Sequence, residues 1–420
     1  MQTVSNIHVK ESVDHLFRYH AGQMVSVLCR IFGFEKIDLI EDAVQDALVA
    51  ALRKWPFGGM PENPTAWLTQ VAKNRVLDQI RVDRKKEPAE SFLELVAKSA
   101  DDEQIFFSRE IHEDQLRIIF ACCHPSIAPD SQVALTLKII GGFSISEIAR
   151  AYLSNEAAIA KMLTRAKTRL RETGVALEIP APSELNDRLE SVLKVLYLMF
   201  NEGYAASGGD ELVRKDLCFE AIRLCRVLAA HPVTTAPRVH ALLALFLFQG
   251  ARLSTRSDHR GELLLLADQD RSLWDKQMLA SAIDHFQSSA SGTELSNYHL
   301  ETEIAAIHAL APSYESTDWA RILETYEKLQ KHQFSIVAEL NRIVVLEKVQ
   351  GPGHALIALQ RFEKEYAVSN FNLFYITKAH FLVELSKSKE ALAAYTRALD
   401  LTSNRPVRKF LFGRIKALSS

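Results

Sequence analysis

The chain has 420 residues, a formal net charge of −2 and 48% hydrophobic residues, which is the composition of a globular protein with two or three domains. This charge excludes a uniformly basic protein that coats nucleic acid, but it allows local basic patches. The N-terminus has no apolar signal core, and the longest apolar run, Ala241 to Phe248, is far short of the ~18 residues of a membrane span. We therefore expect a cytoplasmic protein without membrane association.

Apolar residues recur at helical spacing along nearly the whole chain, and strand-like alternation is absent. This pattern predicts an all-α fold. The first helix is expected at residues 11–32 and the second at 38–54, ending before Pro56. A glycine-rich loop at 57–64 follows, and a third helix is expected to start at Pro64.

Two stretches are rich in basic residues, which predicts contact with nucleic-acid phosphates at two places. In the helix after Pro64 the cations are Lys73, Arg75, Arg81, Arg84 and Lys85. Residues 161–171 hold five Lys or Arg residues and no acid. The glycine-rich loop beside the first of these helices suits an unstacked base of strand-separated DNA. Trp67 there suits either the core or base stacking, and the core is favoured because Leu68 and Leu77 share its side.

A short segment after Gly142 has the pattern of a helix-turn-helix. Ser144 and Glu147 have the spacing of a capping box, and a turn at 153–155 separates two amphipathic helices. The polar face of the second helix carries Asn155, Lys161, Thr164, Arg165 and Lys167. A basic second helix predicts a recognition helix for the major groove, and an ordinary solvated helix is the alternative.

The helix expected at 38–54 has an acidic face opposite its apolar one. Asp38, Glu41, Asp42, Gln45 and Asp46 lie on it. Such a face would repel phosphate, so it favours a basic protein partner over DNA, although a merely solvated face is equally consistent.

Other polar clusters give weaker signals. Cys122-Cys123-His124 lacks the spacing and the second ligand pair of a zinc site, so no metal or other cofactor is expected. An enzyme would need to recruit isolated residues such as His124, His240, His308 and Asp268, and no catalytic motif accompanies them. The stretch Asp268 to Arg271 is interpreted as a turn that caps a helix at Ser272. We therefore do not expect an enzyme.

The C-terminal part, from residue 185, is expected to be helical throughout. Helix pairs at 318–347 and 374–399 have the length of a tetratricopeptide unit, whereas 185–300 shows no clear period. A repeat solenoid and an irregular helical domain with one such hairpin both remain open.

These parts, in this order, resemble an alternative sigma factor of the extracytoplasmic-function group of the sigma-70 family, and specifically a subgroup with a long helical extension. Leu48 stands where the group usually has an aromatic residue. The motifs for the sigma regions are Asp42-Ala-Val-Gln45-Asp46, Asn63-Pro64 with Ala66-Trp67-Leu68, Asn74-Arg75, Asp78 and Arg81, then Phe143-Ser144, Glu147-Ile148-Ala149 and Arg165-Ala166-Lys167. The motifs for the extension are Cys122-Cys123-His124-Pro125, Phe200 to Tyr204, Asp268 to Asp275, Thr317-Asp318-Trp319 and Leu340-Asn341-Arg342.

The resemblance implies a domain order and a set of contacts. The domains would be region 2 at 11–87, a linker at 88–112, region 4 at 113–178 and a tetratricopeptide-like extension at 185–420. Asp42, Gln45 and Asp46 would bind the β′ clamp helices of core RNA polymerase, and region 4 would reach the β flap. The minus-ten promoter element would be bound by Asn63, Trp67, Asn74, Arg75, Asp78, Arg81, Arg84 and Lys85. The minus-thirty-five element would be bound by Asn155, Lys161, Thr164, Arg165 and Lys167.

The implied function is promoter recognition and opening during transcription initiation, with the extension modulating activity through a regulatory protein or an intramolecular contact. Two other functions remain possible. One is a helical-repeat scaffold, and the other is a regulator that binds duplex DNA without polymerase.

Overall fold

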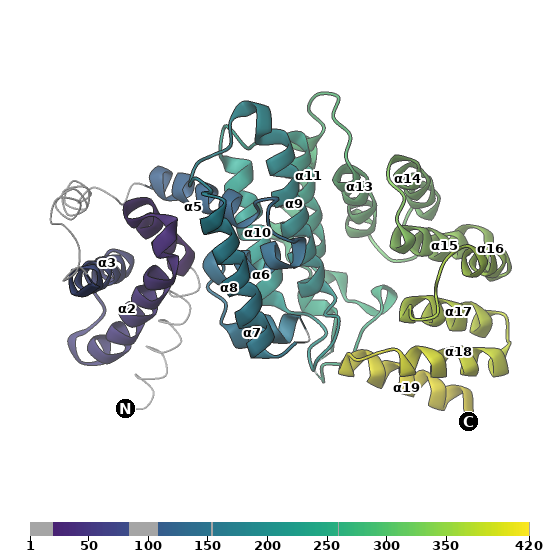
Figure 1. Cartoon of the computed structure of the whole chain (residues 1–420). Coiled ribbons are helices and arrows are strands. Elements are labelled where there is room, and N and C mark those ends of the chain that lie inside the picture. The colour runs from purple at the N-terminus through teal and green to yellow at the C-terminus, as the bar shows by residue number, and fades with distance from the viewer. Residues whose placement is uncertain (1–19, 84–107, 153, 259, 420) are drawn as a thin grey trace. The chain divides into compact units, whose positions relative to one another are not determined.

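The computed structural model describes residues 20–83, 108–152, 154–258 and 260–419. These residues are mostly helical and contain no β-strand, which confirms the predicted all-α fold (Figure 1). The chain divides into two compact units, Met1–Leu196 and Tyr197–Ser420. Nowhere in the described ranges does a helix combine the length and the apolar character needed to cross a membrane.

The first unit begins with a helix that covers the described residues 20–32, and the expected start at residue 11 lies outside them. This helix stops at Gly33, whose φ of 86° is in the left-handed region that glycine adopts without strain. After a short 3-10 turn, α2 (Ile37–Gly58) and α3 (Pro64–Asp83) pack against each other. The predicted helix start at Pro64 is confirmed.

The end of α2 differs from the prediction. The helix continues through Pro56 to Gly58, because a proline in the last turn removes only its own N–H bond. The amide of Gly59 donates to the carbonyl of Trp55 over 3.0 Å and closes this turn. The ring of Trp55 lies 5.5 Å from that of Trp67, which joins the end of α2 to the start of α3. The loop is therefore shorter than the expected 57–64.

The second half of the first unit is a further group of helices. They are α5 (Ser108–Cys122), α6 (Pro129–Ile139), α7 (Ile145–Ala151), α8 (Glu156–Glu172) and the beginning of α9 (Pro182–Tyr204). Residues 108–112 of the expected linker belong to α5, and the rest of that linker lies outside the described residues. The amide of Gln132 donates to the carbonyls of His124 and Ile127, which fixes the turn between α5 and α6.

The five cysteines of the chain are buried and free. Burial raises the pKa of the Cys123 thiol to about 12, so the thiol stays protonated at neutral pH. The ring of His124 bonds the hydroxyl of Ser126 over 2.7 Å. Among the residues with a described position, no three His, Cys, Asp or Glu side chains are grouped as a metal site.

The two halves of the first unit touch closely. A Cβ atom added to Gly22 would lie 2.0 Å from the carbonyl oxygen of Ile140, so only glycine fits this approach. Arg30 donates to the buried carboxylate of Asp114 over 2.9 Å. These contacts join the helix at residues 20–32 to α5 and to the end of α6.

The second unit has one fully apolar helix at the centre of its first half. α11 (Pro237–Gly250) packs against α10 (Lys215–Ala230), α12 (Lys276–Ser289) and α13 (Asn297–Leu310). Its residues from Ala241 to Phe248 are buried on every side. The longest apolar run of the sequence is thus a core helix.

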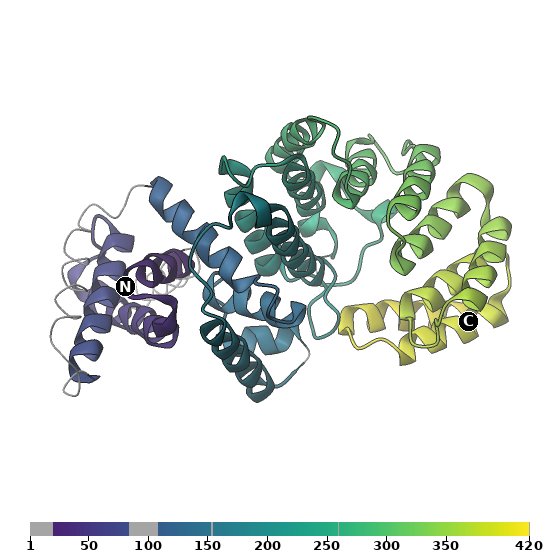
Figure 2. The same ribbon diagram turned by 45° about the horizontal axis from the view of Figure 1, so that its top comes forward.

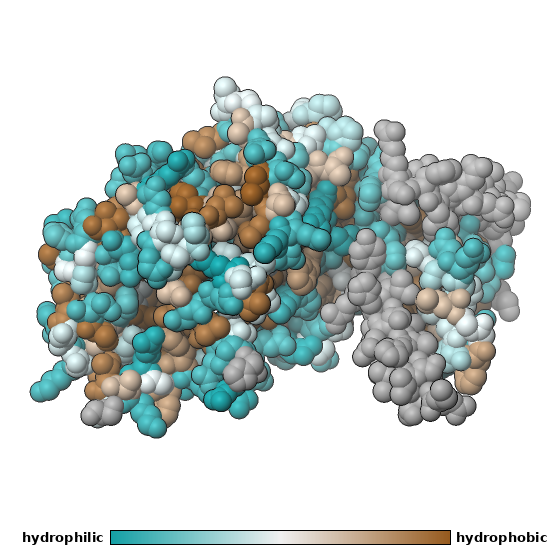
Figure 3. Space-filling view, turned by 180° about the vertical axis from the view of Figure 1, so that it is seen from behind, coloured by the Kyte–Doolittle hydropathy of each residue, from teal (hydrophilic) through white to brown (hydrophobic). Residues whose placement is uncertain are grey.

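The remaining helices of the second unit follow one another as stacked pairs, visible in green to yellow in Figure 2. They are α14 (Trp319–His332), α15 (Ile336–Gln350), α16 (Pro352–Glu365), α17 (Asn372–Glu384), α18 (Ser388–Asp400) and α19 (Arg405–Ser419). Each packs against the next in the chain. The first helices of the pairs recur roughly every 34 residues, the period of tetratricopeptide repeats. On the face drawn in Figure 3, hydrophilic and hydrophobic side chains are interspersed, as is ordinary for a protein surface.

Candidate nucleic-acid interface

The exposed acidic face of α2 is the first element of the site. Ile40, Val44 and Ala47 point into the core, so Asp42, Gln45 and Asp46 project to solvent from the other side of the helix. All three side chains proposed for a protein partner are therefore accessible together. Leu48 of α2, which replaces the aromatic residue usual in the sigma-factor group that the sequence resembles, is half-buried.

The polar face of α3 lies beside this acidic face. The side-chain oxygen of Asn63 accepts from the amide of Ala66 over 3.0 Å, so Asn63 caps the helix rather than pointing freely into solvent. Leu68, Val76 and Ile80 fill the core. The exposed side chains on the opposite face are Asn74, Arg75, Asp78 and Arg81.

Ion pairs link this set of residues. Arg75 lies 3.7 Å from the carboxylate of Asp46, and Arg81 lies 3.3 Å from that of Asp78. Both pairs are exposed, so they are weak and can exchange for phosphate. A groove of about 640 Å³ between α2 and α3 is lined by Asp42, Asp46, Arg75 and Asp78. The sequence-predicted protein-binding and DNA-binding residues thus share one groove.

The loop between α2 and α3 presents apolar side chains to water. Phe57 is 93% exposed and Met60 is 59% exposed. An exposed aromatic ring beside basic α3 is the arrangement on which an unpaired base stacks. Trp67 is only partly exposed and packs on Trp55, as the favoured core interpretation predicts. Arg84 and Lys85, the last two residues predicted for this surface, lie outside the described residues.

α7 and α8 form two helices joined by a turn of four residues. The capping box of Ser144 and Glu147 is present, with the Glu147 carboxylate accepting from the Ser144 amide over 2.9 Å. Asn155 caps α8 by accepting from the amide of Ala158 over 2.8 Å. Lys161, Thr164 and Arg165 are exposed along α8. The predicted capping box is therefore confirmed, whereas the helix-turn-helix and its contact with DNA stay predictions.

Lys167 differs from its expected place on the exposed face of α8. It is only 8% exposed, and its ammonium group donates to Asp38 over 2.8 Å and to the buried carboxylate of Glu41. Arg171 also bonds Asp38, and Lys138 lies 3.8 Å from Glu41. We call these five residues the α2–α8 ion-pair cluster. Their pairing was missed because the partners are far apart in sequence.

The charges of the cluster stabilise one another. Burial alone would raise the pKa of Asp38, but the hydrogen bonds from Lys167 and Arg171 outweigh it and hold that pKa below its usual value. Burial likewise opposes the charge of Lys167, yet Glu41 and Asp38 raise its pKa above the usual value. Both side chains are therefore charged at neutral pH.

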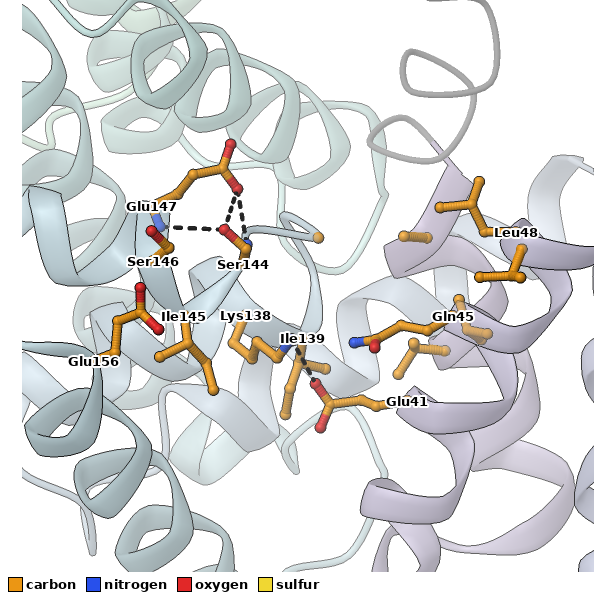
Figure 4. Close-up of a pocket in the computed structure, with 15 residues that line it drawn as sticks. Glu41, Gln45, Leu48, Lys138, Ile139, Ser144, Ile145, Ser146, Glu147 and Glu156 are labelled. Atoms are coloured by element: carbon orange, nitrogen blue, oxygen red, sulfur yellow. Dashed lines mark hydrogen bonds and ion pairs between the residues drawn. The ribbon is translucent and has the colours of Figure 1, made fainter. Parts of the chain in front are cut away.

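A cavity of about 770 Å³ lies beside the ion-pair cluster. Figure 4 shows Glu41 and Gln45 extending from α2 towards Lys138 and Ile139 of α6. Gln45 lines this cavity and remains exposed, so the contact of α2 with α6 and α8 occupies Asp38 and Glu41 but leaves Gln45 accessible. The acidic face is thus divided into a half that pairs with cations of α6 and α8 and an exposed half that does not.

Comparison with known proteins agrees with this geometry. Residues 16–86 match the family model described as Sigma-70 region 2, which spans the helices that build the groove. This match supports a sigma factor of the sigma-70 family. Promoter recognition is the role of that region, and core RNA polymerase and promoter DNA are the partners that it implies.

Two further similarities involve other parts of the chain. Residues 188–290 match a family of unknown function, DUF6596. An uncharacterized protein of Rhizobium meliloti (strain 1021) is 36% identical over 375 residues, which are 88% of each chain. The chain and this relative are therefore similar along most of their length.

Proposed function

We propose that the chain is an alternative sigma factor of the extracytoplasmic-function group that acts in the cytoplasm by binding, without making or breaking a covalent bond. Asp42, Gln45 and Asp46 would hold the β′ clamp helices of core RNA polymerase. The observation that carries this proposal is their joint exposure on α2, next to the polar face of α3.

The minus-ten element would be bound on α3 and its preceding loop. Asn74, Arg75 and Arg81 offer hydrogen-bond donors, and the exposed ring of Phe57 offers a stacking surface, which adds one residue to those predicted from sequence. Capture of an unpaired base there would offset an unpairing cost of a few kcal/mol. Asp78 would position Arg81 through their ion pair.

The minus-thirty-five element would be bound by α8, with region 4 also reaching the β flap. Lys161, Thr164 and Arg165 are available for this without rearrangement. Lys167 can contact DNA only after its bonds to Asp38 and Glu41 are exchanged. We infer that the ion-pair cluster opens when both promoter elements are bound.

A pull-down of core RNA polymerase by the full chain tests the first step. Asp46→Arg places a cation on the acidic face and is expected to reduce retention by about tenfold or more, because like charges then meet at the interface. Asp284→Arg, an exposed acid of α12, is the matched control and should retain polymerase like the wild type. Equal retention by both variants would remove the acidic face of α2 from the proposal.

Promoter-DNA binding, measured with and without core polymerase, separates the sigma factor from the alternatives. A duplex-binding regulator would bind promoter DNA equally well with and without core polymerase, whereas a sigma factor would need it. A scaffold would bind neither DNA nor polymerase.

We further propose that the extension at 185–420 is tetratricopeptide-like and modulates activity. The roughly 34-residue recurrence of the helix pairs from α14 to α19 supports the first part. Removing the extension, to leave residues 1–178 ahead of α9, is expected to change transcription in vitro. Equal transcription by both chains would contradict a modulating role.

A further inference from the structure

Three arginines of the second unit lie close together, and none of them forms a salt bridge with an acid among the described residues, although the charge of Glu315 acts on Arg271. Arg252 and Arg256 follow α11, and Arg271 begins a short 3-10 turn, Arg271–Leu273. Asp270 accepts from the amide of Ser272 over 2.9 Å, which confirms the predicted capping turn. The same turn places Arg271 beside the first two arginines, because the amide of Asp275 donates to the carbonyl of Ala251 over 2.9 Å.

Two guanidinium groups share one aromatic ring. The Cζ atom of Arg256 lies 3.8 Å from the centre of the Tyr204 ring, and that of Arg252 lies 5.8 Å from it. Stacking on an aromatic face stabilises a cation, but it uses none of the N–H groups of the guanidinium plane. The in-plane donors of both residues therefore still need acceptors.

Those acceptors are missing. Within the described part of the chain, neither Arg252 nor Arg256 makes a side-chain hydrogen bond or an ion pair. The Nε atom of Arg252 and the Nη1 atom of Arg256 are buried without a partner. Glu202, an acid near Tyr204 in sequence, is bonded to Arg214 over 2.7 Å instead.

Arg271 adds a third positive charge. Its Nη1 atom donates to the carbonyls of His308 and Ala311, each over 2.7 Å, while its buried Nη2 atom has no acceptor. Burial, with the charges of Arg252 and Arg271, lowers the pKa of His308 to about 4, so this imidazole is neutral and its buried Nδ1 atom is also unpartnered. Three guanidinium groups are thus gathered here, and Glu315 offsets only part of the charge of Arg271.

Like charges that are partly buried together are unfavourable unless an anion offsets them. A guanidinium fork matches the two oxygens of a carboxylate or phosphate. A phosphate monoester carries about −1.5 to −2 charges at neutral pH, whereas a carboxylate carries one. Two unpaired guanidiniums next to a third therefore favour the phosphate.

We propose that Arg252, Arg256 and Arg271 form a binding site for a dianionic phosphate group, either free or part of a small phosphorylated molecule. Arg252 and Arg256 bind the phosphate oxygens through their free N–H groups. Tyr204 holds both guanidiniums in place, and Arg271 adds a third positive charge nearby.

Thermal unfolding of the full chain in potassium phosphate tests the site, with potassium chloride at equal ionic strength as the reference. A ligand that binds only the folded state raises the melting temperature as its concentration increases. We expect this rise for the wild type and not for the Arg252→Gln/Arg256→Gln double variant. Arg321→Gln, which removes an arginine already paired with Glu303, is the matched control and should respond like the wild type.

Calorimetric titration with inorganic phosphate gives the affinity, and each single glutamine variant should weaken binding about tenfold. Glycerol 3-phosphate, with glycerol as its control, distinguishes the two sources: tighter binding than inorganic phosphate indicates a phosphorylated molecule, and equal binding indicates free phosphate. Equal melting temperatures of the wild type in phosphate and chloride would overturn the site. An unchanged phosphate response of the double variant would overturn it as well.

A purely structural role of the arginines has a different signature. Arg256→Met keeps the aliphatic stem but removes the unpaired charge, so its melting temperature without phosphate should equal or exceed that of the wild type. Circular dichroism checks that its helical content is unchanged. A lower melting temperature together with a retained phosphate response would assign Arg256 to the structure alone and contradict the proposal.

Discussion

Two groups of charges in this molecule, each with buried members, differ in their partners. In the α2–α8 ion-pair cluster, Lys167 and Arg171 meet Asp38 and Glu41. In the arginine group of the second unit, Arg252 and Arg256 meet an aromatic ring and no acid among the described residues. Both groups involve cations that sequence patterns alone would place on a solvated surface.

The difference separates internal contacts from external ones. A buried charge with a complementary partner in the same chain contributes to the conformation in which the two meet. A buried charge without such a partner indicates that a ligand or a macromolecule supplies the complementary charge. The first group therefore concerns the conformation of the sigma domains, and the second concerns a molecule still to be bound.

The largest effect is expected from removing the central cation of the ion-pair cluster. Lys167→Met leaves Glu41, which is 8% exposed, without its closest partner. Breaking a buried pair in this way costs about 3 kcal/mol, which corresponds to roughly 100-fold faster opening of the contact. Hydrogen exchange of the amides in α2 and α8 measures this opening.

Lys161→Met is the control for this change, because Lys161 lies on the same helix and is exposed. In the Lys161→Met variant, the amides of α2 should exchange at the wild-type rate. If Lys167→Met also exchanged at that rate, the ion pairs would contribute nothing to the contact, and the distinction between the two charge groups would fail.

A smaller, pH-dependent effect is expected at Asp38. The pKa of Asp38 is lowered in the folded state, so its contribution is present above about pH 4, the pKa of an unfolded aspartate, and is lost as the pH falls through the folded value. Calorimetric melting of the wild type should therefore shift downwards below pH 4. In Asp38→Asn this component of the acid shift should be absent, and an identical acid profile in the two proteins would contradict the pairing.

Local sequence features predicted the helices well. Ser144 and Glu147 form the capping box that their spacing predicted, because a cap involves residues only two or three positions apart. Asn63 and Asn155, which were predicted only as DNA-binding residues, cap their helices as well. Pro56 was misleading, since its effect depends on whether it falls in the middle or in the last turn of a helix.

The candidate site was predicted less completely, for a physical reason. The helical period identifies Asp42 and Asp46 as one face of α2, but it cannot tell which acids of that face will meet cations from another helix. Lys167 belongs to a basic stretch whose other members are exposed, and only the fold brings it to Glu41. The arginine group likewise brings Tyr204 together with Arg252 and Arg256, which lie about fifty residues later in the sequence and belong to no common motif.

The smallest effect is expected where a charge is both paired and exposed. Arg321 of α14 donates through two nitrogens to Glu303 of α13, with 62% of its side chain accessible. Water and salt screen such a pair, so Arg321→Gln should leave the melting temperature of the full chain nearly unchanged at physiological ionic strength. Repeating the melt at low salt should reveal a slight loss. A large loss at physiological salt would mean that pairing alone, without burial, stabilises this fold, and the contrast between the two buried groups would then need a different explanation.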